Sequence, residues 1–269
     1  MIRRIFVLSL LLIALLVSAY SVFAITYGQP DGGEHPYVGL IVFDDAEGPA
    51  WRCTGTLVSS TVVLTAGHCT DGAVAARIWF QEDMTAAANS EYPFGGRTSY
   101  EGTPYAHPNF GPFALPNTYD IGVVVLRGRG ARMSTYGVIP SLGFLDNLKN
   151  QRGQNEDFFT VVGYGLQSVI PEQSALRIRM KGTSGLINLE SALTDGYNLQ
   201  TTNNPGQGQG PGGTCSGDSG GPIFWQNTNI IVAINSFGLN ANCVGNDFSY
   251  RTDIADSQNF LAGFGITPQ

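Results

Sequence analysis

The hexapeptide Gly-Asp-Ser-Gly-Gly-Pro at Gly217–Pro222 is the most informative stretch of this 269-residue sequence. Serine is a weak nucleophile unless a neighbouring base takes its proton. Glycines around a serine let backbone N–H groups converge on one point, which is what an oxyanion hole requires. The stretch therefore predicts a nucleophile at Ser219, although an ordinary Gly/Asp/Ser turn would use the same residue types.

A second motif, Thr-Ala-Gly-His-Cys at Thr65–Cys69, directly follows the apolar run Val62–Leu64. His68 is a candidate general base, and a structural or metal-binding histidine is the alternative. No second histidine or cysteine follows at zinc-finger spacing, which argues against a metal site. The other two histidines, His35 and His107, are expected to be structural.

Asp120 opens the apolar run Ile121–Leu126, a position where turn and cap residues are also common. Asp120 is a candidate catalytic acid because of the order of the three motifs along the chain, which is His68, Asp120, Ser219. The chymotrypsin-type triad has this order, whereas the subtilisin and α/β-hydrolase triads have other orders. The three motifs together therefore predict a nucleophilic triad.

With these motifs in place, the sequence resembles the trypsin–chymotrypsin family of serine endopeptidases over about residues 25–264. Supporting segments are Ala106–Asn109, Val161–Gly165 and Ser236–Gly238. The last two resemble the family motifs Gly-Trp-Gly and Ser-Trp-Gly, and in this chain another aromatic residue stands in place of each tryptophan. The resemblance implies one protease domain over 25–269, built from two antiparallel six-stranded β-barrels at about 25–130 and 131–250, with a C-terminal helix at about 253–264.

Composition and pattern favour the same all-β class independently. Glycine accounts for 35 residues and charged residues for only 13%, which indicates many turns and few surface helices. Short β-rich runs recur between Gly, Pro, Asn and Asp residues, and no long amphipathic helix follows any of them, as a parallel βαβ unit would need. These runs are Tyr37–Phe43, Thr54–Val58, Thr61–Thr65, Arg77–Phe80, Ile121–Leu126, Phe158–Val162, Leu176–Lys181 and Ile230–Asn235.

The resemblance also implies roles for particular residues. Ser219 attacks the scissile carbonyl, His68 transfers the proton, and Asp120 orients the imidazole. The N–H groups of Gly217 and Ser219 form the oxyanion hole, and Ser236–Gly238 pairs with the substrate backbone. This chemistry requires no metal or organic cofactor.

The pocket for the substrate residue before the scissile bond (P1) is implied to have Gly213 at its base, six residues before Ser219. Without an aspartate there, an unpaired buried arginine or lysine is costly, so an apolar or aromatic P1 residue is expected. The segment Val244–Tyr250 is expected to form the opposite wall. Asp247 pointing inward would restore a basic preference, and Phe248 pointing inward would shorten the pocket.

The N-terminal residues 1–24 have the pattern of a secretory signal peptide, with a basic start, an apolar run and small residues before the cleavage site. An uncleaved membrane anchor is the alternative. Cleavage after Ala24 would expose Ile25, and the resemblance implies that this new terminus pairs with Asp218 and activates the enzyme. Cleavage after Ala19 would leave a short propeptide instead.

Four cysteines in an exported chain are expected to form disulfides, and the sequence alone permits three connectivities. The resemblance implies the pairs Cys53–Cys69 and Cys215–Cys243.

A net charge of −7 argues against binding to nucleic acid or to an anionic membrane. The expected partners are protein or peptide substrates and protein protease inhibitors. The expected product is an extracellular monomer that is free of the membrane after signal cleavage. A catalytically silent binding module on the same fold, or an esterase acting on small acyl groups, is the alternative.

Overall fold

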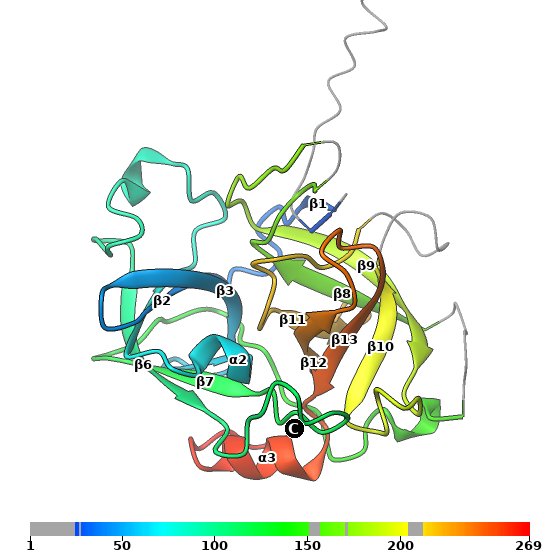
Figure 1. The fold of residues 1–269 in the computed structure, drawn as a ribbon. Coiled ribbons are helices and arrows are strands. Elements are labelled where there is room, and N and C mark those ends of the chain that lie inside the picture. Colours follow the sequence, from blue (N-terminus) through cyan, green and yellow to red (C-terminus); the bar gives the residue numbers. More distant parts are fainter. Residues whose placement is uncertain (1–24, 27, 151–156, 170–171, 204–211) are drawn as a thin grey trace, which may run out of the picture.

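The computed structural model describes residues 25–26, 28–150, 157–169, 172–203 and 212–269. These residues form two closed antiparallel β-barrels with few, short helices (Figure 1). The expected all-β class and pair of six-stranded barrels are thereby confirmed. The predicted signal peptide, residues 1–24, lies outside the described residues.

The first barrel closes in the order β2-β3-β4-β7-β6-β5. All seven residues of β2 are buried, because this run of Val, Leu, Ile and Phe packs into the barrel on one face and against neighbouring segments on the other. The strands are β2 (Val38–Asp44), β3 (Pro49–Leu57), β4 (Val62–Thr65), β5 (Ala75–Trp79), β6 (Tyr100–Ala106) and β7 (Gly122–Leu126).

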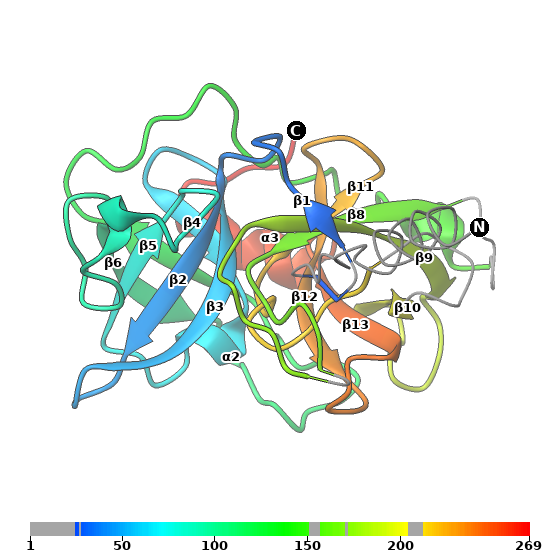
Figure 2. The same cartoon turned by 90° about the horizontal axis from the view of Figure 1, so that it is seen from above.

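The second barrel has the strand order β9-β10-β13-β12-β11-β8 and closes through pairing of β8 with β9. Figure 2 shows it beside the first barrel, with β2–β6 on one side and β8–β13 on the other. Its strands are β8 (Phe158–Gly163), β9 (Met180–Asn188), β10 (Asn198–Asn203), β11 (Pro222–Trp225), β12 (Ile231–Gly238) and β13 (Gly245–Arg251).

The two ends of the described chain cross between the barrels. The short strand β1 (Gln29–Pro30) pairs with β9 and so adds to the second barrel. At the other end, Leu261 of helix α3 (Ala255–Ala262) belongs to the hydrophobic cluster that includes Val63 and Val123 of the first barrel. Each barrel is therefore held partly by a segment that is distant in sequence.

Helix α3 confirms the expected C-terminal helix but not the way it begins. The helix is shorter than the expected 253–264, and the residue at its N-cap is Ile254, which makes no side-chain capping hydrogen bond. The Asp253 carboxylate instead accepts hydrogen bonds from Arg251 and from the backbone N–H of Leu145. No helix among the described residues is long and apolar enough to cross a membrane.

A buried arginine ties the barrels together. Arg179, next to β9, donates from Nε to Asp31 Oδ2 at 2.9 Å. Its Nη1 donates to the carbonyl oxygens of Val38 (3.1 Å) and Phe80 (3.0 Å) in the first barrel. Burial alone would raise the pKa of Asp31, but hydrogen bonds from His35 and the charge of Arg179 lower it to about 2. The ion pair is therefore maintained over the physiological pH range.

Candidate active site

Asp120 and His68, which are 52 residues apart, meet beside the short helix α2 (Gly67–Thr70). The backbone N–H of His68 donates to Asp120 Oδ1 at 2.8 Å, and His68 Nδ1 lies 2.9 Å from Oδ2. The hydroxyl of Ser236, on β12, donates to the same Oδ2. Gly67 allows this approach, because a Cβ there would lie 3.2 Å from Asp120 Oδ1 and 2.9 Å from the ring of Phe110.

This contact sets the charge state of both side chains. Burial would lower the pKa of His68, but the hydrogen bond and negative charge of Asp120 outweigh it and raise that pKa. Burial would likewise raise the pKa of Asp120, but hydrogen bonds from His68 and Ser236 and the charge of His68 lower it. Because ionised Asp120 can only accept, Nδ1 of a neutral His68 carries the proton and Nε2 presents its lone pair.

Ser219 lies in the loop between β10 and β11, in contact with the first barrel. The backbone N–H of Thr54, on β3, donates to the Ser219 carbonyl at 2.8 Å, and the Thr54 hydroxyl donates to the Gly217 carbonyl at 2.8 Å. Gly220 has φ +76°, and a Cβ there would overlap Thr65 Oγ1. The glycine-rich hexapeptide is therefore needed for the loop to approach β3 and β4 so closely.

Within the hexapeptide Gly217–Pro222, the hydrogen bonds leave two backbone donors free. The N–H groups of Asp218, Gly220 and Gly221 each donate to a backbone carbonyl. Those of Gly217 and Ser219, by contrast, find no acceptor among the described residues. Ser219 Oγ forms no hydrogen bond with His68, and His68 Nε2 instead lies 3.6 Å from Cys69 Sγ. Catalytic hydrogen bonds often form only when substrate binds, so the missing Ser219–His68 hydrogen bond is compatible with proton transfer.

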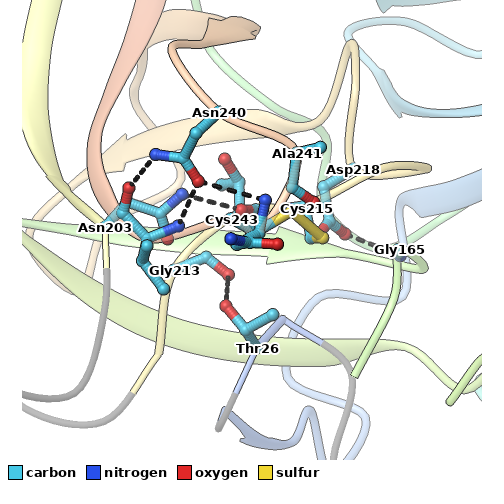
Figure 3. The surroundings of a disulfide bond; sticks show 12 residues. Thr26, Gly165, Asn203, Gly213, Cys215, Asp218, Asn240, Ala241 and Cys243 are labelled. Carbon is cyan, nitrogen blue, oxygen red and sulfur yellow. Dashed lines mark hydrogen bonds between the residues drawn. A yellow bond between two sulfur atoms is a disulfide. The ribbon is translucent and has the colours of Figure 1, made fainter. Parts of the chain in front are cut away.

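Asp218 is buried, and its carboxylate points towards Gly165 (Figure 3). Its carboxylate accepts hydrogen bonds from the backbone N–H groups of Gly165 (2.7 Å) and Cys215 (2.9 Å). Burial raises the pKa of Asp218 to about 7, and these two hydrogen bonds offset burial only in part. Among the described residues no cationic side chain forms an ion pair with it.

The first described residues lie against the same loop. The Ile25 side chain is fully buried, and its Cγ2 lies 3.2 Å from the position of a Cβ on Gly212. The Thr26 hydroxyl donates to the Gly213 carbonyl at 3.0 Å, as Figure 3 also shows. Ile25 therefore contacts the segment 212–218, which contains Asp218, the residue with which the resemblance pairs the new terminus.

A cavity of about 430 Å³ extends from Ser219 between the segments 214–216 and 235–241. Ser236, Phe237 and Gly238, which were predicted to pair with the substrate backbone, line this cavity. The structure also answers which of Asp247 and Phe248 faces inward. Asp247 lines the cavity, whereas Phe248 is buried and stacks on Phe237 with ring centroids 4.8 Å apart.

The base of this cavity contains a residue that the sequence did not reveal. Asn203, at the end of β10, lines the cavity, and a Cβ on Gly213 would overlap its Oδ1. Asn203 Nδ2 donates to Asp247 Oδ1 (2.6 Å) and to the Thr214 carbonyl (2.9 Å). Thr214 in turn donates its backbone N–H to Asp247 Oδ2 (3.2 Å). Asn203 thus occupies the space that a side chain at Gly213 would need.

A second cavity of about 230 Å³ adjoins His68 and Asp120 and shares Ser236 and Phe237 with the first. Its far wall is apolar and comes from the segment before Asp120, through Phe110, Pro112 and Leu115. This wall could not be predicted from the sequence, because its apolar residues lie in a loop without periodicity.

The remaining predicted residues are placed as follows. The disulfides join Cys53 to Cys69 and Cys215 to Cys243, which selects one of the three open connectivities. Figure 3 shows the second of them. His35 pairs with Asp31 and stacks on Phe224, and His107 stacks on Tyr119.

Two barrels that meet at a buried aspartate with its histidine partner and at a serine in a glycine-rich loop define the class of chymotrypsin-like serine hydrolases. The family model described as Trypsin matches residues 27–261, so the chain belongs to the trypsin family and is a serine endopeptidase. As a protease of this family it acts on protein substrates and is a candidate target for protein inhibitors.

Characterised relatives agree with this assignment. Brachyurin of Leptuca pugilator is 28% identical over 212 residues, which cover 77% of this chain and 83% of that protein. Serine protease 1 of Drosophila melanogaster is 26% identical over 221 residues, covering 81% of this chain and 77% of the relative.

Solved structures support the fold alone, since their sequence identity is low. HL collagenase has a TM-score of 0.67 at 17% identity, covering 90% of this chain and all of that chain. An inactivated protease paralogue of the scabies mite has a TM-score of 0.63 at 16% identity, covering 91% of this chain and all of that one.

The contact between Asp120 and His68 predicts a titration effect. In Asp120→Asn the pKa of His68 should fall below its ordinary value, because the carboxylate charge is lost and burial remains. NMR titration of the His68 ring measures this shift. The His107 ring is the internal control, since its pKa responds to burial and Asp256. An unchanged His68 titration would mean that Asp120 does not control this imidazole.

Proposed function

We propose that the chain is a secreted endopeptidase that hydrolyses peptide bonds through Ser219, His68 and Asp120. The observation that carries this proposal is the pair of unused N–H groups at Gly217 and Ser219, beside the Asp120–His68 pair. Unsatisfied donors in a tight loop are unfavourable unless water or a substrate oxygen accepts from them. A developing oxyanion requires two such converging donors.

The reaction follows from these positions. Ser219 Oγ bonds to the scissile carbonyl carbon while its proton passes to His68 Nε2, and the carbonyl oxygen becomes an anion held by the two N–H groups. Collapse of this intermediate breaks the C–N bond, and His68 gives its proton to the leaving amine. Water then attacks the acyl-enzyme in the same way, which releases the acid and restores Ser219. Asp120 stabilises the imidazolium in both steps.

The strand β12 positions the substrate. Ser236–Gly238 ends β12 beside Ser219 and lines the 430 Å³ cavity, so an extended substrate can add to it as a further antiparallel strand. The P1 side chain then enters the cavity. The apolar wall at Phe110 and Leu115 receives side chains further from the scissile bond on the acyl side.

For P1 we propose an apolar or aromatic residue while Asp247 is protonated. Burial raises the pKa of Asp247 to about 7, although hydrogen bonds from Thr214 and Asn203 oppose this. With the amide of Asn235 oriented as in the structure, the single Thr214 hydroxyl proton faces two acceptors, Asn235 Oδ1 and Asp247 Oδ2. A protonated Asp247 completes this chain by donating to Thr214. A neutral pocket base gives a P1 lysine or arginine no counter-ion.

For activation we propose cleavage between Ala24 and Ile25, with pairing of the new α-amino group and Asp218. The support is that Ile25 and Thr26 already lie against 212–213, and that the buried Asp218 has no cationic partner among the described residues. Pairing should raise the α-amino pKa above its ordinary 7.7–8.0. The stabilisation from this pair is then complete below the unfolded value and is lost as pH rises through the raised one.

The same proposal places the enzyme outside the cell as a monomer, free of the membrane once residues 1–24 are removed. Two disulfides fit an oxidising compartment. We propose in addition that the protease domain divides into two barrel units at about 25–130 and 131–250. A catalytically silent module is disfavoured because such proteins usually lose a triad residue, and all three are present here.

The nucleophile is tested by Ser219→Ala. We expect loss of labelling by a fluorophosphonate probe and a fall in peptide hydrolysis of about 10⁶-fold, because no other group replaces the attacking oxygen. Ser141→Ala, an exposed serine outside both cavities, should label like the wild type. Wild-type protein that neither labels nor hydrolyses peptides would instead support the silent binding module.

The pocket is tested by the pH dependence of specificity. The ratio of kcat/KM for a P1 Lys substrate to that for a P1 Leu substrate should rise about tenfold as pH increases through 7, because Asp247 ionises. A ratio cancels the shared dependence on His68. In Asp247→Asn the ratio should stay low at every pH, while the exposed control Asp195→Asn should behave as wild type. Strong cleavage after lysine at pH 5 would refute the apolar preference.

Activation is tested by N-terminal sequencing of the active secreted enzyme, which should begin at Ile25. A form retaining one residue before Ile25 should lose about 10²-fold in kcat/KM, since Asp218 stays buried without its partner. Proteolytic removal of the added residue should restore activity, and Asp218→Asn should not respond to it. Activity of the mature form should also decline on the alkaline side. Full activity of the extended form would rule out this mechanism.

A further inference from the structure

A third cavity, of about 200 Å³, lies on the first barrel away from the P1 pocket. It is formed by the hairpin of β2 and β3, through Val42, Trp51 and Arg52, and by Tyr92 and Pro93. It shares no residue with either of the cavities that adjoin Ser236.

Arg52 connects this cavity to the oxyanion loop. Its Nε lies 3.4 Å from the position of a Cβ on Gly217. Arg52 is partly buried, and among the described residues its side chain forms no ion pair or hydrogen bond, although its charge lowers the pKa of the buried Asp218. A guanidinium carries five donors and stays charged at every physiological pH. An unpaired cation of this kind is unusual in a chain with a net charge of −7.

The surroundings add positive rather than negative charge. Asp44, which follows Val42 on β2, is already paired with Arg77 at 2.7 Å. Arg177 does not line the cavity itself, but its guanidinium lies 4.7 Å from the centroid of the ring of Tyr92, which does. Arg52 therefore lines the cavity without an ion-pair partner among the described residues, and a second cation contacts its Tyr92 wall.

The walls are fixed in place. Trp51 donates its indole N–H to the Cys69 carbonyl at 2.8 Å, and its ring stacks on Phe43. Tyr92 packs edge-on against the buried Trp79, with ring centroids 5.3 Å apart. Little side-chain ordering is then needed when a ligand enters, which favours binding.

The path of the substrate leads to this cavity. Both cavities at Ser236 lie on the acyl side, where P1 and the residues before it bind. The leaving amine must depart past the other side of Gly217, where β3 and Arg52 lie. Each extended residue advances the chain by about 3.3 Å and alternates its side chain, so one of the first two residues after the scissile bond (P1′ or P2′) faces Arg52.

We infer that the Trp51–Arg52–Tyr92 cavity is a leaving-group subsite that selects a glutamate or aspartate at P1′ or P2′. This inference rests on the proposed function. A carboxylate there receives charge-assisted hydrogen bonds from Arg52, and Arg177 adds to the attraction. The established family membership does not require this preference, because it depends on Arg52 and on the Tyr92–Pro93 wall of this particular chain.

The test uses internally quenched peptides with one fixed P1 residue, and with Glu, Gln or Lys placed in turn at P1′ and at P2′. At one of the two positions kcat/KM should be about tenfold higher for Glu than for Gln, and lower again for Lys. The Glu preference should weaken as ionic strength rises. Equal rates for Glu and Gln at both positions in the wild type would overturn the inference, whatever the variants do.

Two variants locate the effect. Arg52→Gln should bring the Glu-to-Gln ratio close to one, and Arg52→Glu should make Lys the preferred residue. A p-nitroanilide, which has no P1′ or P2′ residue, is the reference substrate: in Arg52→Gln the Glu peptide should slow relative to it, whereas the Gln peptide should not. The control Arg129→Gln removes an exposed cation in the turn after β7 and should retain the preference.

The remaining outcomes are decisive as well. If Arg52→Gln lowers hydrolysis of the anilide and of every peptide by the same factor, Arg52 supports the oxyanion loop and the inference is wrong. Absence of any hydrolysis or fluorophosphonate labelling in the wild type would refute the proposed function. Hydrolysis without a Glu preference would refute this inference alone.

Discussion

The carboxylate of Asp120 is the point at which the two barrels are brought into one site. One oxygen accepts from the backbone of His68 in the first barrel, and the other contacts both the His68 ring and the hydroxyl of Ser236 in the second. Burying an ionised carboxylate is costly, so it is stable only where donors surround it. The two barrels must therefore keep the arrangement that supplies those donors. The buried Arg179, which bonds to Val38 and Phe80, holds the same arrangement from another side.

Strands with strong β-patterns could be predicted from the sequence, and those without could not. The runs at Tyr37–Phe43 and Phe158–Val162 match β2 and β8 to within one residue at each end. By contrast, β6 contains Gly102 and Pro104, and β13 is largely polar, so neither has the apolar alternation that marks a strand. These strands form because partners on both sides complete their hydrogen bonds.

The strand expected at Leu176–Lys181 is wrong over its first four residues. The apolar and basic residues there favour a strand, yet β9 begins only at Met180. Arg177 has φ +55°, which interrupts the extended chain and places its guanidinium over Tyr92. Motifs made of adjacent residues, such as those around His68 and Ser219, could be recognised from sequence. Asn203 and Arg52 could not, because the role of each depends on a three-dimensional contact with a glycine, Gly213 or Gly217, that no sequence pattern marks.

The contact between Asn203 and Gly213 makes these two positions evolutionarily interdependent. Since a side chain at 213 would collide with Asn203 Oδ1, a mutation that introduces one must be accompanied or preceded by a smaller residue at 203. A variant that keeps Asn203 and gains a side chain at 213 is sterically unfavourable. A variant that loses Asn203 and keeps Gly213 deprives Asp247 and the Thr214 carbonyl of the hydrogen bonds that Asn203 donates. Lineages with this pair are thus expected to retain it. Attempts to redesign the pocket by exchanging residue 213 alone meet a steric barrier at the end of β10, outside the loop that carries residue 213.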